Sequence, residues 1–189
     1  FTPLAKGMNS EYANQNAYDA ISVHGGSGFI MEYKCQRLFR DARIFSIYEG
    51  TTQLQVVAAI RYVTNGTYLG IIKEMLEKEV APEFQALKER VAKMVEKYED
   101  AINYVKAAGN NDLHDFLARR LYEMTAEIIM SLLILDDATR APELFAKSAN
   151  VYVRYAEGTV AGHYAYIKEF KAEDLADFLA ATPEEAPAE

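Results

Sequence analysis

Three motifs decide the fold of this chain, and they follow closely on one another: Val23–Phe29 (VHGGSGF), Arg37–Arg43 (RLFRDAR) and Ile47–Gln55 (IYEGTTQLQ). The first is a glycine cluster in which a polar ligand can approach bare backbone. The second gathers arginines and an aspartate onto two helical turns. The third places one carboxylate, Glu49, beside a glycine. Together the three motifs are a far more specific signal than a glycine-rich loop alone.

The composition around these motifs predicts an all-α protein built of antiparallel helical bundles. Half of the 189 residues are hydrophobic, so a sizeable core can be buried. Ala, Leu, Glu and Lys are abundant at helical spacing, and Pro is rare. Because the chain opens directly on a helix without Met, we expect it to be a carboxyl-terminal piece of a longer protein.

Charge and cysteine content exclude several classes of function. The net charge of −8 argues against a nucleic-acid partner, because phosphate binding requires a basic field. The single cysteine, Cys35, cannot form an intramolecular disulfide, which favours a cytoplasmic location. No Cys/His cluster has the spacing of a metal site. The apolar run 128–135 is too short to span a membrane.

Glycine and proline divide the first third of the chain into helices. Pro3 suits the first turn of a helix, and Gly25-Gly26 end that helix. We expect an extended stretch at 29–33 and then a second helix at about 34–47. Within it, Asp41 is predicted to neutralise arginines at a buried helix junction.

The rest of the chain reads as an added helical bundle. Pro82 opens a long amphipathic helix that ends near Gly109, and Asn111 or Asp112 is expected to cap the next helix. Pro142 starts another long helix, and a short helix is expected at 173–181. We therefore predict three parts, which are a domain at 1–69, a bundle at 70–181 and a disordered tail at 182–189.

The residues around Glu49 admit two interpretations. Glu49 can be a solvated turn residue, with Thr51 as the N-cap of a helix at 52–64. Alternatively, it is a general base, because removal of a proton next to a carbonyl group needs a carboxylate in an apolar pocket. Likewise, Gly25-Gly26 can be an ordinary helix end or a site of ligand contact.

The three motifs resemble those of the carboxyl-terminal helical domain of flavin-dependent acyl-CoA dehydrogenases. The resemblance covers residues 3–69, and a weaker likeness continues into the extra helical domain of some larger members. In short- and medium-chain members a Tyr-Glu-Gly-Thr motif supplies the catalytic base, at the position of Glu49. The resemblance thus implies substrate contacts from Tyr48, Glu49 and Gly50, with the backbone N–H of Glu49 polarising the thioester.

The resemblance also implies a cofactor, FAD. Thr51 and Gln53 lie where the family touches the flavin, and Gly25 and Gly26 match backbone that approaches its adenine and pyrophosphate end in a neighbouring subunit. Ser22 departs from the usual glutamine and cannot span the same gap. We expect the parent protein to bind FAD and the 189-residue piece to lack it.

Three functions are consistent with these motifs. The first is a parent acyl-CoA dehydrogenase that forms trans-2-enoyl-CoA and passes electrons to an electron-transfer flavoprotein. The second is an acyl-CoA oxidase, and the third is a non-catalytic oligomerisation module. An exposed Glu49 favours the third, whereas a base lies against an apolar cavity. We expect homo-oligomers that form through an exposed apolar set: Leu38, Phe39, Ile44, Phe45 and Leu54.

Overall fold

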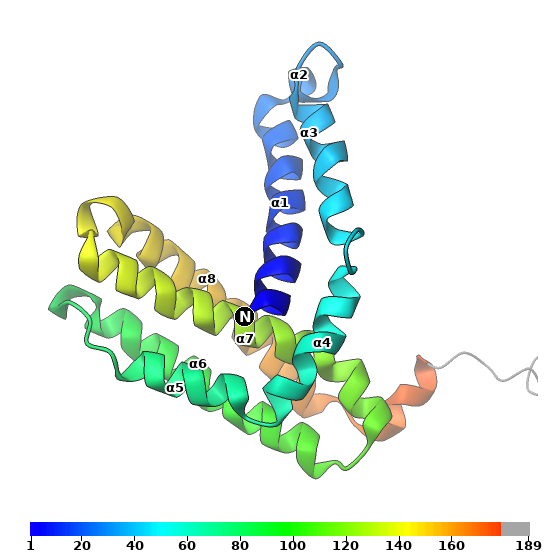
Figure 1. Cartoon of the computed structure of the whole chain (residues 1–189), viewed down its shortest axis with the longest axis vertical. Helices are drawn as coiled ribbons and strands as arrows, with labels where there is room; N and C mark the ends of the chain where they lie inside the picture. The colour runs from blue at the N-terminus through cyan, green and yellow to red at the C-terminus, as the bar shows by residue number, and fades with distance from the viewer. Residues whose placement is uncertain (179–189) are drawn as a thin grey trace, which may run out of the picture.

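The computed structural model describes residues 1–178, and every regular element in that range is a helix, which confirms the all-α prediction (Figure 1). The elements form two arms. One arm is a hairpin of α1 and α3 that projects away from the rest of the molecule, and the other is a bundle that contains α5 to α8. Helix α4 joins the two arms.

The projecting arm begins with α1 (Thr2–His24), which has Pro3 in its first turn and Gly25 (φ 59°) after its last residue. A short helix α2 (Gly26–Phe29) follows at the tip. The extended stretch predicted at 29–33 does not form, because Phe29 ends α2 and residues 30–33 make bends and turns. Helix α2 packs on α1 because Gly28 is tight against it: a Cβ on Gly28 would lie 2.5 Å from the carbonyl oxygen of Ile21.

The second helical segment of this hairpin is shorter and less regular than predicted. Helix α3 (Cys35–Ala42) gives way to the 3₁₀ helix η1 (Arg43–Ser46), so the expected helix at 34–47 tightens in its last turn. The turn that contains Glu49 follows. Helix α4 (Thr52–Thr64) then has the predicted bounds, and α5 (Thr67–Glu77) starts after Gly66.

The bundle arm is built from long helices whose starts are set by local signals. The 3₁₀ helix η2 (Pro82–Phe84) leads into α6 (Gln85–Ala107). The cap of α7 (Asn111–Arg140) is neither Asn111 nor Asp112, because the side chain of Asn110 accepts the backbone N–H of Leu113 at 3.0 Å. Helix α8 (Pro142–Glu169) begins at its proline as predicted.

The chain then ends in a short element and in residues that lie outside the described range. The 3₁₀ helix η3 (Ala172–Asp177) occupies most of the predicted helix at 173–181. The predicted tail at 182–189 lies outside the described residues. Within residues 1–178, no helix is both apolar enough and long enough to cross a lipid bilayer.

Helix α7 is the centre of the fold. It packs against α1, α4, α5, α6 and α8. Its buried face carries Leu117, Leu121 and Ile128, none of which is exposed, and these side chains belong to one apolar core that extends to Leu4 and Met8 of α1. Burial of apolar surface is the main favourable term in folding. The shared apolar core therefore joins the projecting arm to the bundle.

Candidate functional site

Glu49 lies in a turn with unusual backbone geometry. Its φ is 48°, and Gly50 follows with φ 88°. Among residues 1–178, Glu49 is the single non-glycine residue with positive φ. Residues other than glycine rarely adopt positive φ, because the Cβ then clashes with the backbone. The resulting backbone strain persists only where the surrounding structure fixes the conformation.

Helix α1 provides the groups that fix this turn. The ammonium group of Lys6 donates to the carbonyl oxygens of Phe45 (2.7 Å) and Gly50 (2.6 Å), which lie on either side of Glu49. The hydroxyl of Ser10 also donates to the Phe45 oxygen, at 3.0 Å. The backbone before and after Glu49 is therefore bonded to one rigid helix.

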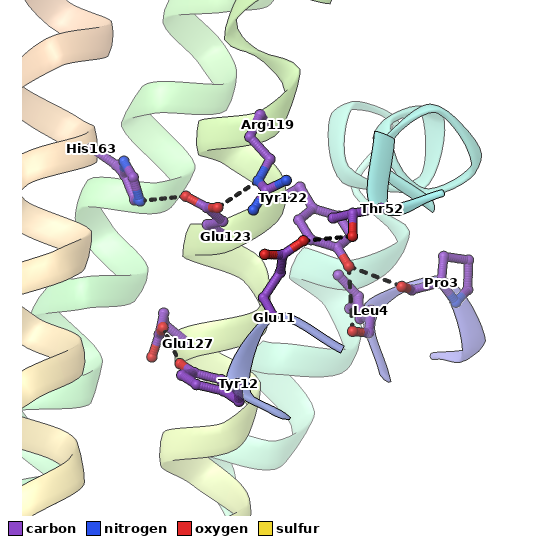
Figure 2. Close-up of polar contacts among 10 residues, drawn as sticks. All are labelled: Pro3, Leu4, Glu11, Tyr12, Thr52, Arg119, Tyr122, Glu123, Glu127 and His163. Atoms are coloured by element: carbon purple, nitrogen blue, oxygen red, sulfur yellow. Dashed lines mark hydrogen bonds and ion pairs between the residues drawn. The ribbon is translucent and has the colours of Figure 1, made fainter. Parts of the chain in front are cut away.

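The start of α4 holds the other end of the turn. The Thr51 hydroxyl oxygen accepts the backbone N–H of Leu54 at 3.2 Å, which makes Thr51 the predicted N-cap. The hydroxyl of Thr52 donates to a carboxylate oxygen of Glu11 at 2.6 Å (Figure 2). Glycine is favoured at position 50 because its φ of 88° strains residues that carry a Cβ.

The carboxylate of Glu49 is exposed in this chain and lines none of the described pockets. Tyr48, which is 44% exposed, lines an open groove of about 660 Å³ along α1 that also includes Lys6 and Asn9. Residues 1–178 alone therefore do not enclose Glu49 in the apolar cavity that a base needs. A catalytic role would require walls from outside this range.

The two predicted cofactor contacts are far apart within the chain. Gly25 and Gly26 lie at the tip of the arm, whereas Lys6 and Ser10 hold the Glu49 turn near the other end of α1 (Figure 1). Fifteen or more helical residues separate them, or roughly 25 Å. One copy of the chain does not bring both motifs to the same end of a ligand.

The individual groups nevertheless suit one side of an extended polar ligand. A Cβ added at Gly25 or Gly26 would meet nothing within 4 Å, so their backbone is open to approach. Gln53 is exposed, and the Thr51 hydroxyl, which accepts from Leu54, keeps its proton free to donate. The residues present therefore fit one side of the flavin dinucleotide that the resemblance implies.

The prediction that Asp41 neutralises arginines at a buried junction is wrong for this chain. Asp41, Arg37, Arg40 and Arg43 are all exposed. No ion pair involves Asp41 within residues 1–178, and Arg43 instead donates to the hydroxyl of Ser46. The reason is tertiary: α3 packs mainly on α1, α2 and η1, and most of its residues are exposed to solvent.

Sequence reasoning missed a buried polar cluster between the two arms (Figure 2). Glu127 of α7 is 2% exposed, and its two carboxylate oxygens accept the hydroxyls of Tyr12 and Tyr152, each at 2.6 Å. Burial, and then the bond to Glu127, raise the pKa of Tyr12; burial, and then the charge of Glu127, raise the pKa of Tyr152. The available signal was a glutamate beside the apolar run 128–135.

A second charged cluster lies one turn away on α7. Glu123 accepts from Arg119, and Nε2 of His163 on α8 lies 2.8 Å from its other oxygen (Figure 2). Burial alone would raise the pKa of Glu123, but the bonds from His163 and Arg119 outweigh burial and lower it. These groups satisfy one another and stabilise the contact between α7 and α8.

The described residues define an all-α protein with two helical parts, which are an arm that presents a Tyr-Glu-Gly-Thr turn and a bundle joined to it. Residues 1–63 match the family model described as "Acyl-CoA dehydrogenase, C-terminal domain", and residues 64–175 match the one described as "Acyl-CoA dehydrogenase C terminal". The chain belongs to the acyl-CoA dehydrogenase family.

Several curated proteins match part of the chain. The CarC subunit of the caffeyl-CoA reductase-Etf complex from Acetobacterium woodii is 50% identical over 52 residues, which is 28% of this chain and 14% of that protein. An acyl-CoA dehydrogenase from Bacillus subtilis is 39% identical over 64 residues, 34% of this chain and 17% of that protein. The matches thus span less than a fifth of these relatives.

A solved structure extends the likeness. An acyl-CoA dehydrogenase family protein from Porphyromonas gingivalis is 38% identical, with a TM-score of 0.57. The match covers 60% of this chain and 98% of that one. At this identity the likeness supports both a common fold and common family membership.

Proposed function

We propose that this chain is the carboxyl-terminal part of an acyl-CoA dehydrogenase that oxidises an acyl-CoA to the trans-2-enoyl-CoA, with Glu49 as the base. The observation that carries the proposal is the strained Glu49 backbone, which Lys6 and Ser10 hold from one side. Strain that is maintained by dedicated contacts is typical of functional sites. Family membership gives the turn its chemistry.

The proposed chemistry assigns two tasks to Glu49. Its carboxylate removes the proton on the α carbon, and its backbone N–H donates to the thioester oxygen as charge develops there. Among residues 1–178 we find no acceptor for that N–H, so it is free to donate. Tyr48 and Gly50 flank the base and contact the substrate. FAD, when bound, accepts the hydride from the β carbon.

The apolar walls around Glu49 come, in this proposal, from parts of the protein outside residues 1–178. FAD is held in the parent by Thr51 and Gln53 at one end and by Gly25 and Gly26 of a second copy at the other. This arrangement makes the parent a homo-oligomer. An electron-transfer flavoprotein is the proposed acceptor, since the relative CarC belongs to an Etf complex.

We assign residues 1–69 to the catalytic helical domain and 70–181 to an added bundle, and we place the protein in the cytoplasm. The acyl-CoA oxidase alternative uses the same residues with oxygen as the acceptor. The oligomerisation-module alternative is favoured by the exposure of Glu49 in this chain, and the experiment below separates it from an enzyme.

The test is Glu49→Gln in the whole protein that contains this chain. The change keeps the shape and the backbone N–H and removes only the proton acceptor. We expect single-turnover bleaching of the flavin absorbance by an acyl-CoA to slow by about 100- to 10,000-fold. Flavin content should stay unchanged, because Thr51, Gln53 and the glycines are intact.

A matched control is Glu96→Gln on the exposed face of α6, which should bleach at the parent rate. If Glu49→Gln bleaches within about threefold of the parent, where loss of a base predicts at least about 100-fold, the base lies elsewhere and Glu49 has no catalytic role. Absence of flavin from the whole protein would favour the oligomerisation module instead.

A further inference from the structure

Helix α1 contacts the bundle with one face and the Glu49 turn with the other. Leu4, Met8 and Tyr12 follow one another at four-residue spacing and pack toward the bundle. Lys6 and Ser10, also four residues apart, reach the turn. An offset of two residues is about 200° around a helix, so the two rows lie on nearly opposite faces.

The bundle face of α1 is bonded to α7 at two points (Figure 2). Near the start of α1, the buried hydroxyl of Tyr122 donates to the carbonyl oxygens of Pro3 (2.9 Å) and Leu4 (3.3 Å). Two turns further along, the hydroxyl of Tyr12 donates to Glu127. Two separated contacts fix both the position of α1 and its rotation about its own axis.

The Glu127 contact is a demanding one. A buried carboxylate needs a donor for each oxygen, because an unpaired charge in the interior is strongly unfavourable. Tyr12 from α1 and Tyr152 from α8 each supply one donor. Any movement of α1 away from α7 would leave one oxygen of Glu127 unpaired, so the carboxylate resists that movement.

The opposite face of α1 is hydrogen-bonded to the Glu49 turn, so the position of α1 sets the position of the turn. Lys6 and Ser10 bind the backbone at Phe45 and Gly50, and Glu11 binds Thr52 at the start of α4. No side chain of the bundle makes a hydrogen bond to the turn itself within residues 1–178. The hydrogen-bonded connection from α7 to the turn therefore passes through α1.

We propose that the added bundle positions the Glu49 turn through α1, with Tyr12, Tyr122 and Glu127 as positioning residues. The mechanical part of this inference stands on the contacts alone. Its consequence for catalysis rests on the proposed function, so the experiment measures the two parts separately.

The mechanical part is tested by hydrogen exchange of the turn in the 189-residue chain. The hydrogen-bonded amides of this segment include those of Ile47, Tyr48, Leu54 and Gln55. Tyr12→Phe should accelerate exchange in the segment 44–55 by about tenfold, the effect of one lost hydrogen bond to a charged group. Tyr152→Phe is the matched control, since it removes an equivalent bond to Glu127 within the bundle, and it should change exchange less than about twofold.

Exchange of 91–102 in α6 serves as the internal reference for global opening. If Tyr12→Phe accelerates 44–55 and 91–102 equally, or if the two tyrosine variants act alike on the turn, the proposal is overturned. Lys6→Met provides a second test. If Tyr12 and Lys6 act through the same connection, the double variant Tyr12→Phe/Lys6→Met should accelerate exchange less than the product of the two single effects. Effects that multiply independently would contradict the proposal.

The catalytic part is tested in the whole protein. Tyr12→Phe should lower kcat by about tenfold, because a base displaced from its productive geometry loses rate before affinity. KM should stay within about threefold, and Tyr152→Phe should leave both constants unchanged. Faster exchange with an unchanged kcat would overturn the link to catalysis. If Glu49→Gln remains active, the proposed function fails, but the exchange result still decides whether the bundle positions the turn.

Discussion

The hydroxyl of Tyr122 lies directly over Gly7, and this approach joins the two arms of the molecule. A Cβ added to Gly7 would be 2.0 Å from the Tyr122 oxygen and 3.0 Å from its Cζ. The absence of a side chain at Gly7 lets the phenol reach the carbonyl oxygens of Pro3 and Leu4. A larger residue at Gly7 therefore requires either the Tyr122 side chain or α1 to move.

We therefore predict that Gly7→Ala destabilises the chain by about 1–3 kcal/mol, the usual effect of overpacking a buried contact. The measurement is the free energy of unfolding in urea, followed by helical circular dichroism. Gly70→Ala is the control, because Gly70 lies in α5 and a Cβ there meets nothing within 4 Å. The control should stabilise the chain by about 0.4–1 kcal/mol. Equal unfolding energies for the two variants would contradict the close approach at Gly7.

The Glu123 cluster predicts a specific loss of stability in acid. Its pKa is lowered in the folded state, so its contribution is present above the ordinary value of 4.5 and is lost as the pH falls through the folded-state pKa. Glu123→Gln should lower the melting temperature near neutral pH, since the bonds from Arg119 and His163 weaken. The difference from the parent should shrink as the pH falls below 4.5 and through the lowered folded-state pKa of Glu123.

Melting curves of the parent, Glu123→Gln and the exposed control Glu96→Gln, each at neutral and acid pH, provide the measurement. The side chain of Glu96 makes no hydrogen bond or ion pair within residues 1–178, so the melting temperature of its variant should follow that of the parent at both pH values. A difference between Glu123→Gln and the parent that is the same at both pH values would show that Glu123 gains nothing from its ionised form.

Exposed apolar side chains on α3, η1 and α4 predict self-association. Leu38 and Leu54 are each 56% exposed, and Phe39, Ile44 and Phe45 are also exposed, as the sequence led us to expect. We expect the sedimentation coefficient of the chain to rise with concentration. Leu38→Glu should largely abolish that rise, because it places a charge in the apolar set.

Val151→Glu is the matched control, since Val151 is also exposed but lies on α8, outside this set. It should behave as the parent does. A chain that stays monomeric at every concentration, or a stronger effect of Val151→Glu than of Leu38→Glu, would place the contact elsewhere or exclude it.

The sequence alone predicted the features that depend on local chemistry. The bounds of α4 follow from Thr51, which caps it, and α8 begins at Pro142, where a missing N–H has no cost. The choice of Asn110 over its two neighbours as a cap was not predictable, because Asn and Asp are all good caps and backbone geometry selects among them. The motif made Glu49 a candidate catalytic base, but the sequence did not predict its positive φ.

Only the tertiary structure decided which polar groups meet. Asp41 and Glu127 are both carboxylates on helices, yet Asp41 is exposed and Glu127 is buried, because α3 lies at the edge of the fold and α7 at its centre. Helical spacing specifies which residues share a face, but the neighbour of that face comes from distant parts of the chain. The apolar run beside Glu127 indicates that this carboxylate is buried, but its contact with Tyr12, 115 residues away, is decided by the fold.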